Sequence, residues 1–431
     1  MRFKTFKYGI HPKDKKELSK DCLFEDMPTG EKVYIPLAQH LGTPASACVE
    51  VGDYVKVGTK IGEASGYVSC NVHSSVSGTV ESFVLRENAM GKRIRHVCIV
   101  NDGKYEEDFM PPLVNPTRED LIARCKDAGL AGMGGATFPT HVKLETKGEI
   151  KALIINGSEC EPYITTDYRL MLDKPNEVME GIRYIAKALD AQEIWIGIEA
   201  NKEDAIRRME EASKDDKNVK VFELQTKYPQ GGEKQLIYAI TKRKVPMGGL
   251  PSDLGYIVLN ISTSLAMYEA CALGKPSFSR YMTVSGEGVV RPANIYVRFG
   301  VPFSEIVEYL GHKDDIAKVI SGGPMMGISL HSFIPVVTKG SSALLLLSED
   351  EIRDVDPTPC INCARCANVC PMGLMPMMTD ALILANKVKE TKAYHPLSCI
   401  ECGCCAYVCP AKRPLVQSQR LAKKLIRERK L

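Results

Sequence analysis

The C-terminal part of the chain carries cysteines at two regular spacings, and thiolates in such groups can bind metals. Of the 16 cysteines, nine lie between residues 360 and 409, and eight of these nine form two runs with the same spacing. The runs are Cys360, Cys363, Cys366 and Cys370 before Pro371, and Cys399, Cys402, Cys405 and Cys409 before Pro410. Clustering of this kind favours metal binding over disulfide formation. Soft sulfur ligands select iron–sulfur clusters or zinc over hard cations.

The spacing resembles that of bacterial ferredoxins with two four-iron clusters, in which the fourth cysteine of each run ligates the other cluster. Three thiolates two residues apart can hold three irons of a cube, and the proline turns the chain toward the second cube. We therefore assign eight ligands and expect Cys404 to be a non-ligand. The first cluster takes Cys360, Cys363, Cys366 and Cys409, and the second takes Cys370, Cys399, Cys402 and Cys405.

A pair of zinc sites is the alternative, because two CxxC pairs can supply a tetrahedron of thiolates. Zinc has no use for the third and fourth cysteines of both runs, so the pattern favours two 4Fe-4S clusters. The remaining cysteines are scattered singly, and we expect them to be buried free thiols. The histidines form no group with metal-site spacing.

A glycine-rich loop at residues 129–139 could bind a phosphate, with Lys143 and Asn156 close behind it in the sequence. The loop follows a helix pattern rather than a strand, so it is not a dinucleotide GxGxxG fingerprint. Glycines let backbone N–H groups approach a phosphate, and a lysine adds a positive charge. Asn156 ends a predicted strand and would face the crevice where open α/β sheets bind ligands. The alternative is a purely structural turn.

Alternating strands and helices must position this loop. From about residue 115 the pattern predicts a parallel sheet covered by helices. Thr117 begins a capped helix that ends near Gly129. Further strands are predicted at 152–156, 193–198, 219–224 and 256–261, and further helices at 176–189, 202–212 and 233–242.

Two β-rich units flank this α/β region. Residues 30–100 resemble a lipoyl or biotinyl barrel-sandwich hybrid, but the chain has no lysine between Ile61 and Gly91 to carry a swinging cofactor. A second β unit is expected at about 281–342. We predict an α/β multidomain chain with a barrel-sandwich hybrid (1–110), a Rossmann-like domain (111–280), a second β-rich domain (281–345), for which the family resemblance given below implies a β-grasp fold, and a helical ferredoxin-like domain (346–431).

Composition and charge place the chain among globular proteins. Its 431 residues suggest three or four domains, and 44% hydrophobic with 25% charged residues is ordinary. The strongest apolar run, 343–347, is far shorter than the roughly 18 residues that cross a bilayer, and no signal peptide is evident, so we expect a cytoplasmic location.

Beyond residue 410 the chain has eight basic residues and one acidic residue. Leu421, Leu425 and Ile426 predict a helix with one apolar face, either solvated or docked on an acidic partner or anionic lipid.

Several motifs together resemble the flavin- and NADH-binding subunit of respiratory complex I. They are the glycine loop, Lys143, Asn156-x2-Glu159-x-Glu161, Tyr228-x3-Gly232-Glu233 and Asn260. The resemblance implies that FMN contacts Gly132, Gly134, Gly135, Lys143, Asn156 and Asn260. It also implies that Phe138, Glu159, Glu161 and Glu233 line the site for NAD(H). This chain differs at Ser158 and Lys234, where that family has acids.

The whole chain is similar to the RnfC subunit of the Rnf complex, through residues 6–12, 73–78, 228–235 and 321–327 as well as both cysteine runs. The resemblance implies a peripheral subunit on the cytoplasmic face of a ferredoxin:NAD+ oxidoreductase that couples electron flow to Na+ or H+ transport. It implies membrane subunits and a ferredoxin-like iron–sulfur subunit as partners, and no nucleic acid. It also identifies residues 281–330 as a soluble-ligand-binding β-grasp (SLBB) unit.

The implied activity is that of an NADH-linked flavin and iron–sulfur oxidoreductase. Clusters move single electrons and nicotinamide takes a hydride, so FMN is needed to connect the two, and no side chain has to act as a covalent catalyst. One alternative is a cobalamin reductase of bacterial microcompartments, but residues 9–12 favour the Rnf family. Another alternative is a non-catalytic electron-transfer scaffold without flavin, but the presence of the flavin-site residues Lys143 and Asn156 disfavours it.

Overall fold

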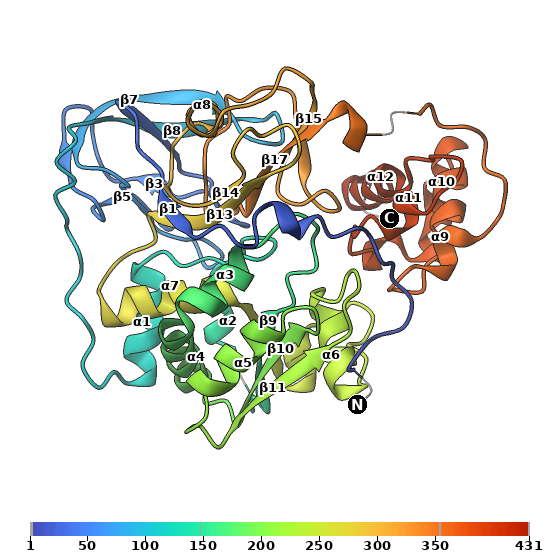
Figure 1. The fold of residues 1–431 in the computed structure, drawn as a ribbon, viewed down its shortest axis with the longest axis horizontal. Helices are drawn as coiled ribbons and strands as arrows, with labels where there is room; N and C mark the ends of the chain where they lie inside the picture. Colours follow the sequence, from blue (N-terminus) through green and yellow to red (C-terminus); the bar gives the residue numbers. More distant parts are fainter. Residues whose placement is uncertain (1–2, 147, 353–354, 430–431) are drawn as a thin grey trace.

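The computed structural model describes residues 3–146, 148–352 and 355–429. Figure 1 shows an α/β unit, two β-rich units that pack against each other, and a small helical unit that contains the C-terminus. Within the described ranges, no helix combines the length and apolar character needed to span a bilayer. This arrangement confirms the predicted α/β multidomain fold.

The first β-rich unit is a sandwich of two antiparallel sheets. One sheet has the order β2 (Lys32–Pro36), β8 (Arg93–Asn101), β7 (Gly78–Glu87) and β4 (Tyr54–Val55). The other has the order β3 (Ser46–Ala47), β5 (Lys60–Glu63) and β6 (Val72–His73). Val33 and Ile35 alternate with more exposed residues along β2, and both are fully buried in the core between the sheets. The pattern of period two therefore produces the expected barrel-sandwich hybrid.

The α/β unit contains a four-stranded parallel sheet. Its order is β11 (Val219–Leu224), β10 (Glu193–Glu199), β9 (Ala152–Gly157) and β12 (Tyr256–Asn260). Leu153 and Ile155 of β9 face a core that contains helices α1, α4 and α7, while Ala152 and Ile154 face α6. The predicted strands are confirmed. The helices are α1 (Arg118–Asp127), α2 (Thr140–Leu144), α3 (Thr166–Asp173), α4 (Pro175–Leu189), α5 (Glu203–Ala212), α6 (Glu233–Thr241) and α7 (Ile261–Ala272).

Helix ends follow from side-chain capping. Thr117 and Asp120 form the reciprocal capping box expected at the start of α1. One boundary was predicted wrongly, because Ile261 begins α7 instead of ending β12. The side chain of Asn260 accepts a hydrogen bond from the Ser262 N–H, and this cap lets the chain pass directly from strand to helix.

The second β-rich unit is a six-stranded mixed sheet with one helix, α8 (Phe303–Leu310). Its order is β1 (Phe24–Asp26), β14 (Ala293–Arg298), β13 (Ser279–Ser285), β17 (Ala343–Ser348), β15 (Ile316–Ser321) and β16 (Ile328–Leu330). The strongest apolar run is the central strand β17. Leu344 and Leu346 pack into the core shared with the barrel, and Leu345 packs on the opposite face. Burial on both faces explains why this run does not alternate.

In its described residues, the cysteine-rich unit contains four α-helices and two 3-10 helices, Lys389–Tyr394 and Pro396–Ser398. The α-helices are α9 (Arg365–Asn368), α10 (Pro376–Leu384), α11 (Cys404–Tyr407) and α12 (Leu415–Glu428). The basic C-terminal helix is confirmed, and Ile426 of its predicted apolar face is buried, but Leu421 was assigned to that face wrongly. Leu421 is exposed, whereas Ala422 and Ile426, one helical turn apart, are buried. The buried stripe of α12 therefore packs within the unit rather than facing away from it.

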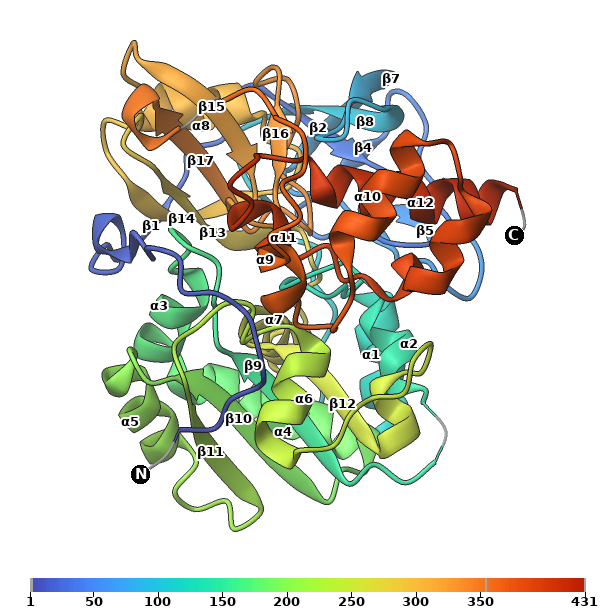
Figure 2. The same ribbon diagram turned by 90° about the vertical axis from the view of Figure 1, so that its right-hand side faces the viewer.

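The N-terminal segment, residues 3–26, joins the units. Lys4 pairs with the edge strand β11, and the Gly9 N–H donates to the Val369 carbonyl in the cysteine-rich unit at 3.0 Å. Ile10 and Tyr228 exchange two backbone hydrogen bonds of 2.8 and 2.9 Å. In Figure 2 this segment, in blue, crosses the α/β unit on its way to β1. The first residues of the chain thus contact three units that follow much later in the sequence.

Candidate redox sites

The glycine loop connects α1 to α2 and is closed by a hydrogen bond from the Gly132 N–H to the Phe138 carbonyl at 2.9 Å. Its tip, Gly134 and Gly135, is exposed. The N–H groups of these two glycines have no acceptor among the residues that the structure describes. A Cβ atom on Gly134 would lie 2.6 Å from the side chain of Asn260. Only glycine therefore lets the loop approach the end of β12 so closely, leaving its N–H groups available to an anion.

Two asparagines end neighbouring strands at the edge of the sheet beside this loop. Asn156 of β9 and Asn260 of β12 are register partners. The Asn156 side chain donates to the Gly231 carbonyl at 2.8 Å. The Asn260 side chain accepts from the Ser262 N–H at 2.8 Å and donates to the Asp167 carboxylate at 2.6 Å. Both amides are fixed at the carboxyl ends of parallel strands, where such sheets bind ligands.

Lys143, on α2, brings a positive charge to the same edge. Its ammonium donates to the Val258 carbonyl in β12 at 3.0 Å and to the Glu233 carboxylate at 3.1 Å. The side chains of Lys143 and Glu233 are 29% and 40% exposed, so both are accessible to a ligand. Through these two contacts, Lys143 places Glu233, the first residue of α6, next to the ends of β9 and β12.

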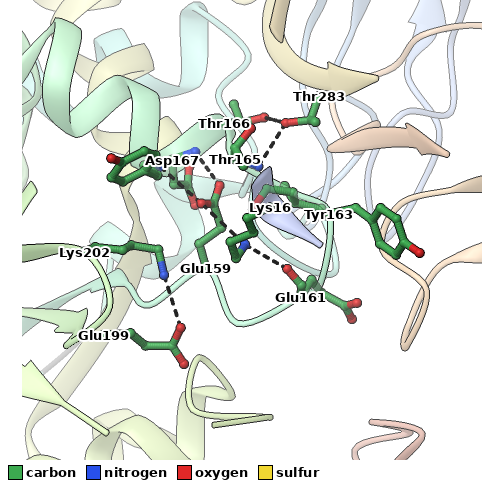
Figure 3. Close-up of polar contacts among 12 residues, drawn as sticks. Lys16, Glu159, Glu161, Tyr163, Thr165, Thr166, Asp167, Glu199, Lys202 and Thr283 are labelled. Atoms are coloured by element: carbon green, nitrogen blue, oxygen red, sulfur yellow. Dashed lines mark hydrogen bonds and ion pairs between the residues drawn. The ribbon is translucent and has the colours of Figure 1, made fainter. Parts of the chain in front are cut away.

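Glu159 points into the protein. Its backbone has a left-handed φ of 45°, and its carboxylate accepts hydrogen bonds from the N–H groups of Asp167 (2.6 Å) and Tyr168 (3.3 Å) at the start of α3. Lys16, from the N-terminal segment, lies 3.9 Å away (Figure 3). Burial raises the pKa of Glu159 to about 7, and Lys16 opposes this rise.

Glu161 is also held by protein groups. Its carboxylate accepts hydrogen bonds from the Met325 N–H at 3.1 Å and the Tyr228 hydroxyl at 3.3 Å. A Cβ atom on Gly323 would lie 2.2 Å from this carboxylate, so the glycine lets the loop after β15 approach Glu161 closely. Burial raises the pKa of Glu161 to about 7 as well. Both carboxyl groups can therefore change protonation near neutral pH.

The structure thus divides the flavin and nucleotide residues that the sequence predicted into two sets. The contacts described above connect one set at a single edge of the sheet, and Phe138 closes the loop there as a half-buried residue. This set comprises Gly132, Gly134, Gly135, Phe138, Lys143, Asn156, Glu233 and Asn260. Glu159 and Glu161 form the second set. Their carboxylates point away from this edge and accept hydrogen bonds from groups in the protein interior.

The second cysteine set lines one cavity in the helical unit. Cys370, Cys399, Cys402 and Cys405 all contribute to its wall, together with Gln419 of α12. Backbone N–H groups point at two of the sulfurs, with Leu374 N 3.3 Å from Cys370 Sγ and Glu401 N 3.3 Å from Cys399 Sγ. The cavity brings the last cysteine of the first run to three cysteines of the second run.

The first cysteine set lies nearer the surface. Cys360 and Cys363 are exposed, while Cys366 and Cys409 are buried in one apolar cluster with Leu415. Cys366 and Cys409 belong to different runs and meet only in the folded unit. Cys404 is fully buried, with its sulfur 4.0 Å from the Tyr228 carbonyl.

A short chain of contacts joins the second cysteine set to the glycine-loop edge. Cys402 and Cys404 pack in one cluster with Tyr228 and Cys160. The Cys160 sulfur accepts a hydrogen bond from the Gly231 N–H at 3.3 Å, and the Gly231 carbonyl accepts one from Asn156. The side chain of Gln235, on α6, also donates to Met372 Sδ at 3.2 Å.

Sequence reasoning missed several residues of this network. Lys16 and Lys202 are buried lysines that bind the turn after β9, and Asp167 links Glu159 to Asn260. Asp167 follows the acidic motif closely and could have been suspected. No spacing rule connects Lys16 to a turn that begins more than a hundred residues later.

Four known families match successive parts of the chain. They are the RnfC barrel sandwich hybrid domain (residues 4–104), the Nuo51 FMN-binding domain (125–269), the SLBB domain (281–329) and a 4Fe-4S dicluster domain (359–412). The matches indicate iron–sulfur clusters instead of zinc at the cysteine runs. Together with the fold, they define an iron–sulfur flavoprotein subunit of an oxidoreductase complex.

Three curated relatives match the chain over almost its full length. The C subunit of the Na+-translocating ferredoxin:NAD+ oxidoreductase complex of Acetobacterium woodii is 41% identical and covers 98% of this chain and 97% of its own. The proton-translocating counterpart of Clostridium ljungdahlii is also 41% identical, with coverages of 97% and 93%. The C subunit of the ion-translocating oxidoreductase complex of Rhodobacter capsulatus is 39% identical, with coverages of 98% and 83%. The chain belongs to the RnfC family of Rnf complex subunits.

A solved structure supports the fold independently. The H2-reduced NAD+-reducing NiFe hydrogenase is similar with a TM-score of 0.50 at 17% identity, over 72% of this chain and 60% of that one. The full-length relatives favour the Rnf family over the cobalamin reductases that the sequence also suggested.

Proposed function

We propose that the chain binds FMN at the edge formed by the glycine loop and the ends of β9 and β12. The free N–H groups at Gly134 and Gly135 and the ammonium of Lys143 form a donor set suited to a phosphate. Gly132 shapes the loop, and Asn156 and Asn260 border the phosphate and ring. When bound, FMN supplies the exchange between one-electron and two-electron transfer.

NAD(H) is proposed to bind on the open side of the same edge. The family resemblance implies that Phe138, Glu159, Glu161 and Glu233 belong to the nucleotide site. Glu233 has direct access, because its side chain is 40% exposed, whereas that of Glu159 is 4% exposed. Glu159 and Glu161 therefore act from the protein interior, where they fix the turn after β9.

Two 4Fe-4S clusters are proposed at the cysteine sets. Cys370, Cys399, Cys402 and Cys405 hold the inner cluster, and Cys360, Cys363, Cys366 and Cys409 hold the outer one. Cys402 of the inner set packs in one cluster with Tyr228, and we infer that this set lies on the side of the flavin edge. The outer set presents Cys360 and Cys363 to the surface. We infer that a partner exchanges electrons at the outer set, and that the inner set connects it to the flavin edge.

This arrangement suits a peripheral subunit on the cytoplasmic face of the membrane, with a ferredoxin-like iron–sulfur subunit as electron partner and ion-transporting membrane subunits beside it. NADH-linked electron transfer is then an activity of this subunit itself, whereas its membrane partners transport Na+ or H+. The observation that carries the proposal is the short contact chain from Cys402 through Tyr228, Cys160 and Gly231 to Asn156.

The test is chemical analysis and reduction of the anaerobically reconstituted protein. We expect about eight irons per chain from two four-iron clusters, FMN released on denaturation, and bleaching of both flavin and cluster absorbance by NADH. Iron without flavin would favour a non-catalytic scaffold. Flavin that NADH reduces while the clusters stay oxidised would contradict the proposed connection.

A further inference from the structure

Lys16 is buried in the turn between β9 and α3, although it comes from the 3-10 helix Lys16–Leu18 of the N-terminal segment. It is 7% exposed. Its ammonium donates to the carbonyls of Glu161 (3.0 Å) and Ile164 and lies 3.9 Å from the Glu159 carboxylate (Figure 3). An ammonium has three donors. Three acceptors of one turn therefore surround this side chain.

A second buried lysine holds the same turn from the other side. The Lys202 ammonium donates to the Ser158 carbonyl at 2.7 Å and pairs with Glu199 at 3.1 Å. The turn contains two non-glycine residues with left-handed backbone, Glu159 (φ 45°) and Tyr163 (φ 67°). Such conformations persist only where the surroundings enforce them. The two ammonium groups provide that enforcement by binding otherwise buried carbonyls.

A continuous path of polar contacts leads from Lys16 to the glycine loop. Glu159 accepts the N–H of Asp167, and the Asp167 carboxylate accepts hydrogen bonds from Asn260 Nδ2 and Ser262 Oγ, each at 2.6 Å. Asn260 in turn lies against Gly134. Each link is buried or half-buried, so solvent screens these contacts weakly.

We propose that Lys16 is a positioning residue for the flavin site, which acts through Glu159 and Asp167 to hold Asn260 against the glycine loop. This inference rests on the proposed function, because it assumes that FMN binds at that edge. It assigns the N-terminal segment a role in cofactor affinity in addition to joining the units. It also explains why a charged side chain is buried where an apolar one would avoid the cost of desolvation.

The experiment measures FMN affinity of deflavinated, cluster-loaded full-length protein by quenching of FMN fluorescence. We compare wild type, Lys16→Met, Glu159→Gln and the double variant. Lys16→Met is expected to weaken FMN binding about tenfold, a usual size for coupling between sites, with cluster absorbance unchanged. In the Glu159→Gln background, the same substitution should change affinity much less, because its partner is already neutral.

Lys20→Met is the matched control, since Lys20 is an exposed lysine just beyond the same 3-10 helix. It should bind FMN like wild type. Equal losses from Lys16→Met in both backgrounds would indicate a merely structural role and overturn the inference. If Lys16→Met does not fold, Glu159→Gln decides alone, because it leaves both carbonyl contacts of Lys16 in place. Unchanged FMN affinity in that variant overturns the inference. A wild type that binds no FMN would instead overturn the proposed function, and this inference with it.

Discussion

The two cysteine runs have nearly the same local backbone and very different surroundings. Asn362 and Glu401 occupy equivalent positions between the first two cysteines of their runs, with left-handed φ values of 56° and 59°. In each run the N–H of this residue points at the preceding sulfur, 3.5 Å from Cys360 and 3.3 Å from Cys399. The spacing therefore dictates the same loop twice.

What differs is what covers each loop. Ile361 is 65% exposed in the first run, whereas its counterpart Ile400 packs with Tyr228 against the α/β unit. Glu401 is bound by Arg420 and Lys423 of α12 at 2.8 and 2.6 Å. The comparison shows that local sequence sets the backbone of each cysteine loop, while tertiary packing decides which loop is exposed and which packs against the α/β unit.

Removing one ligand from each set should separate the roles most strongly. Cys402→Ala should lose the inner cluster, about four irons, and leave the outer cluster unreduced by NADH although the flavin still bleaches. Cys363→Ala should lose a similar amount of iron yet keep NADH reduction of the inner cluster. Iron analysis and low-temperature electron paramagnetic resonance measure both effects. The opposite pattern would reverse the order that we propose.

Solvent access should distinguish the two sets in the unmodified protein. Because Cys360 and Cys363 are exposed and the inner set is largely buried, a chelator should release iron in two phases, with the outer cluster lost first. Absorbance at cluster wavelengths and a colorimetric iron assay follow the phases. A single phase, or earlier loss of the inner cluster, would show that the difference in exposure has no chemical consequence.

A buried carboxyl beside the inner set predicts a pH effect on stability. Burial raises the pKa of Glu161 to about 7, so the folded protein binds more protons here than the unfolded chain does between about pH 4.5 and 7. Stability from this group is therefore lost as pH rises through that window. Glu161→Gln should remove part of the loss, so that the variant is more stable than wild type at pH 8 by about 2 kcal/mol.

Glu159 contributes with the same sign, so the variant should retain a reduced slope. Melting temperatures of both proteins between pH 5 and 8 provide the test. Parallel curves for the two proteins would mean that Glu161 titrates normally and that its burial has no electrostatic cost.

The ion pairs of Glu401 should have the smallest effect. Arg420 is 46% exposed, and surface pairs of this kind contribute about 0.5 kcal/mol. Arg420→Ala should therefore lower the melting temperature only slightly. Lys424→Ala, which alters an exposed and loose contact with Glu428 on the same helix, should leave it unchanged. Equal effects of the two variants would show that these pairs do not stabilise the second run.

The sequence predicted those features that depend on local spacing. The capped start of α1 and the four parallel strands follow from patterns within a few residues, and the assignment of the cysteines as ligands, made from their spacing, stays a prediction. The exposure of Cys363 against the burial of Cys402 could not be predicted, because it depends on which unit packs on each loop. Lys16 was missed for the same reason, since its partners come from the turn after β9. Leu421 was assigned to the apolar face of α12 wrongly because it is as hydrophobic as the buried Ile426, and only packing distinguishes the two residues.

Rapid mixing of the reconstituted protein with NADH resolves the order in which the cofactors are reduced, with the ligand variants used to assign each cluster signal. We predict that flavin absorbance bleaches first, the inner cluster is reduced next and the outer cluster last. Reduction of the outer cluster before the inner one, or in the Cys402→Ala variant, would contradict this prediction.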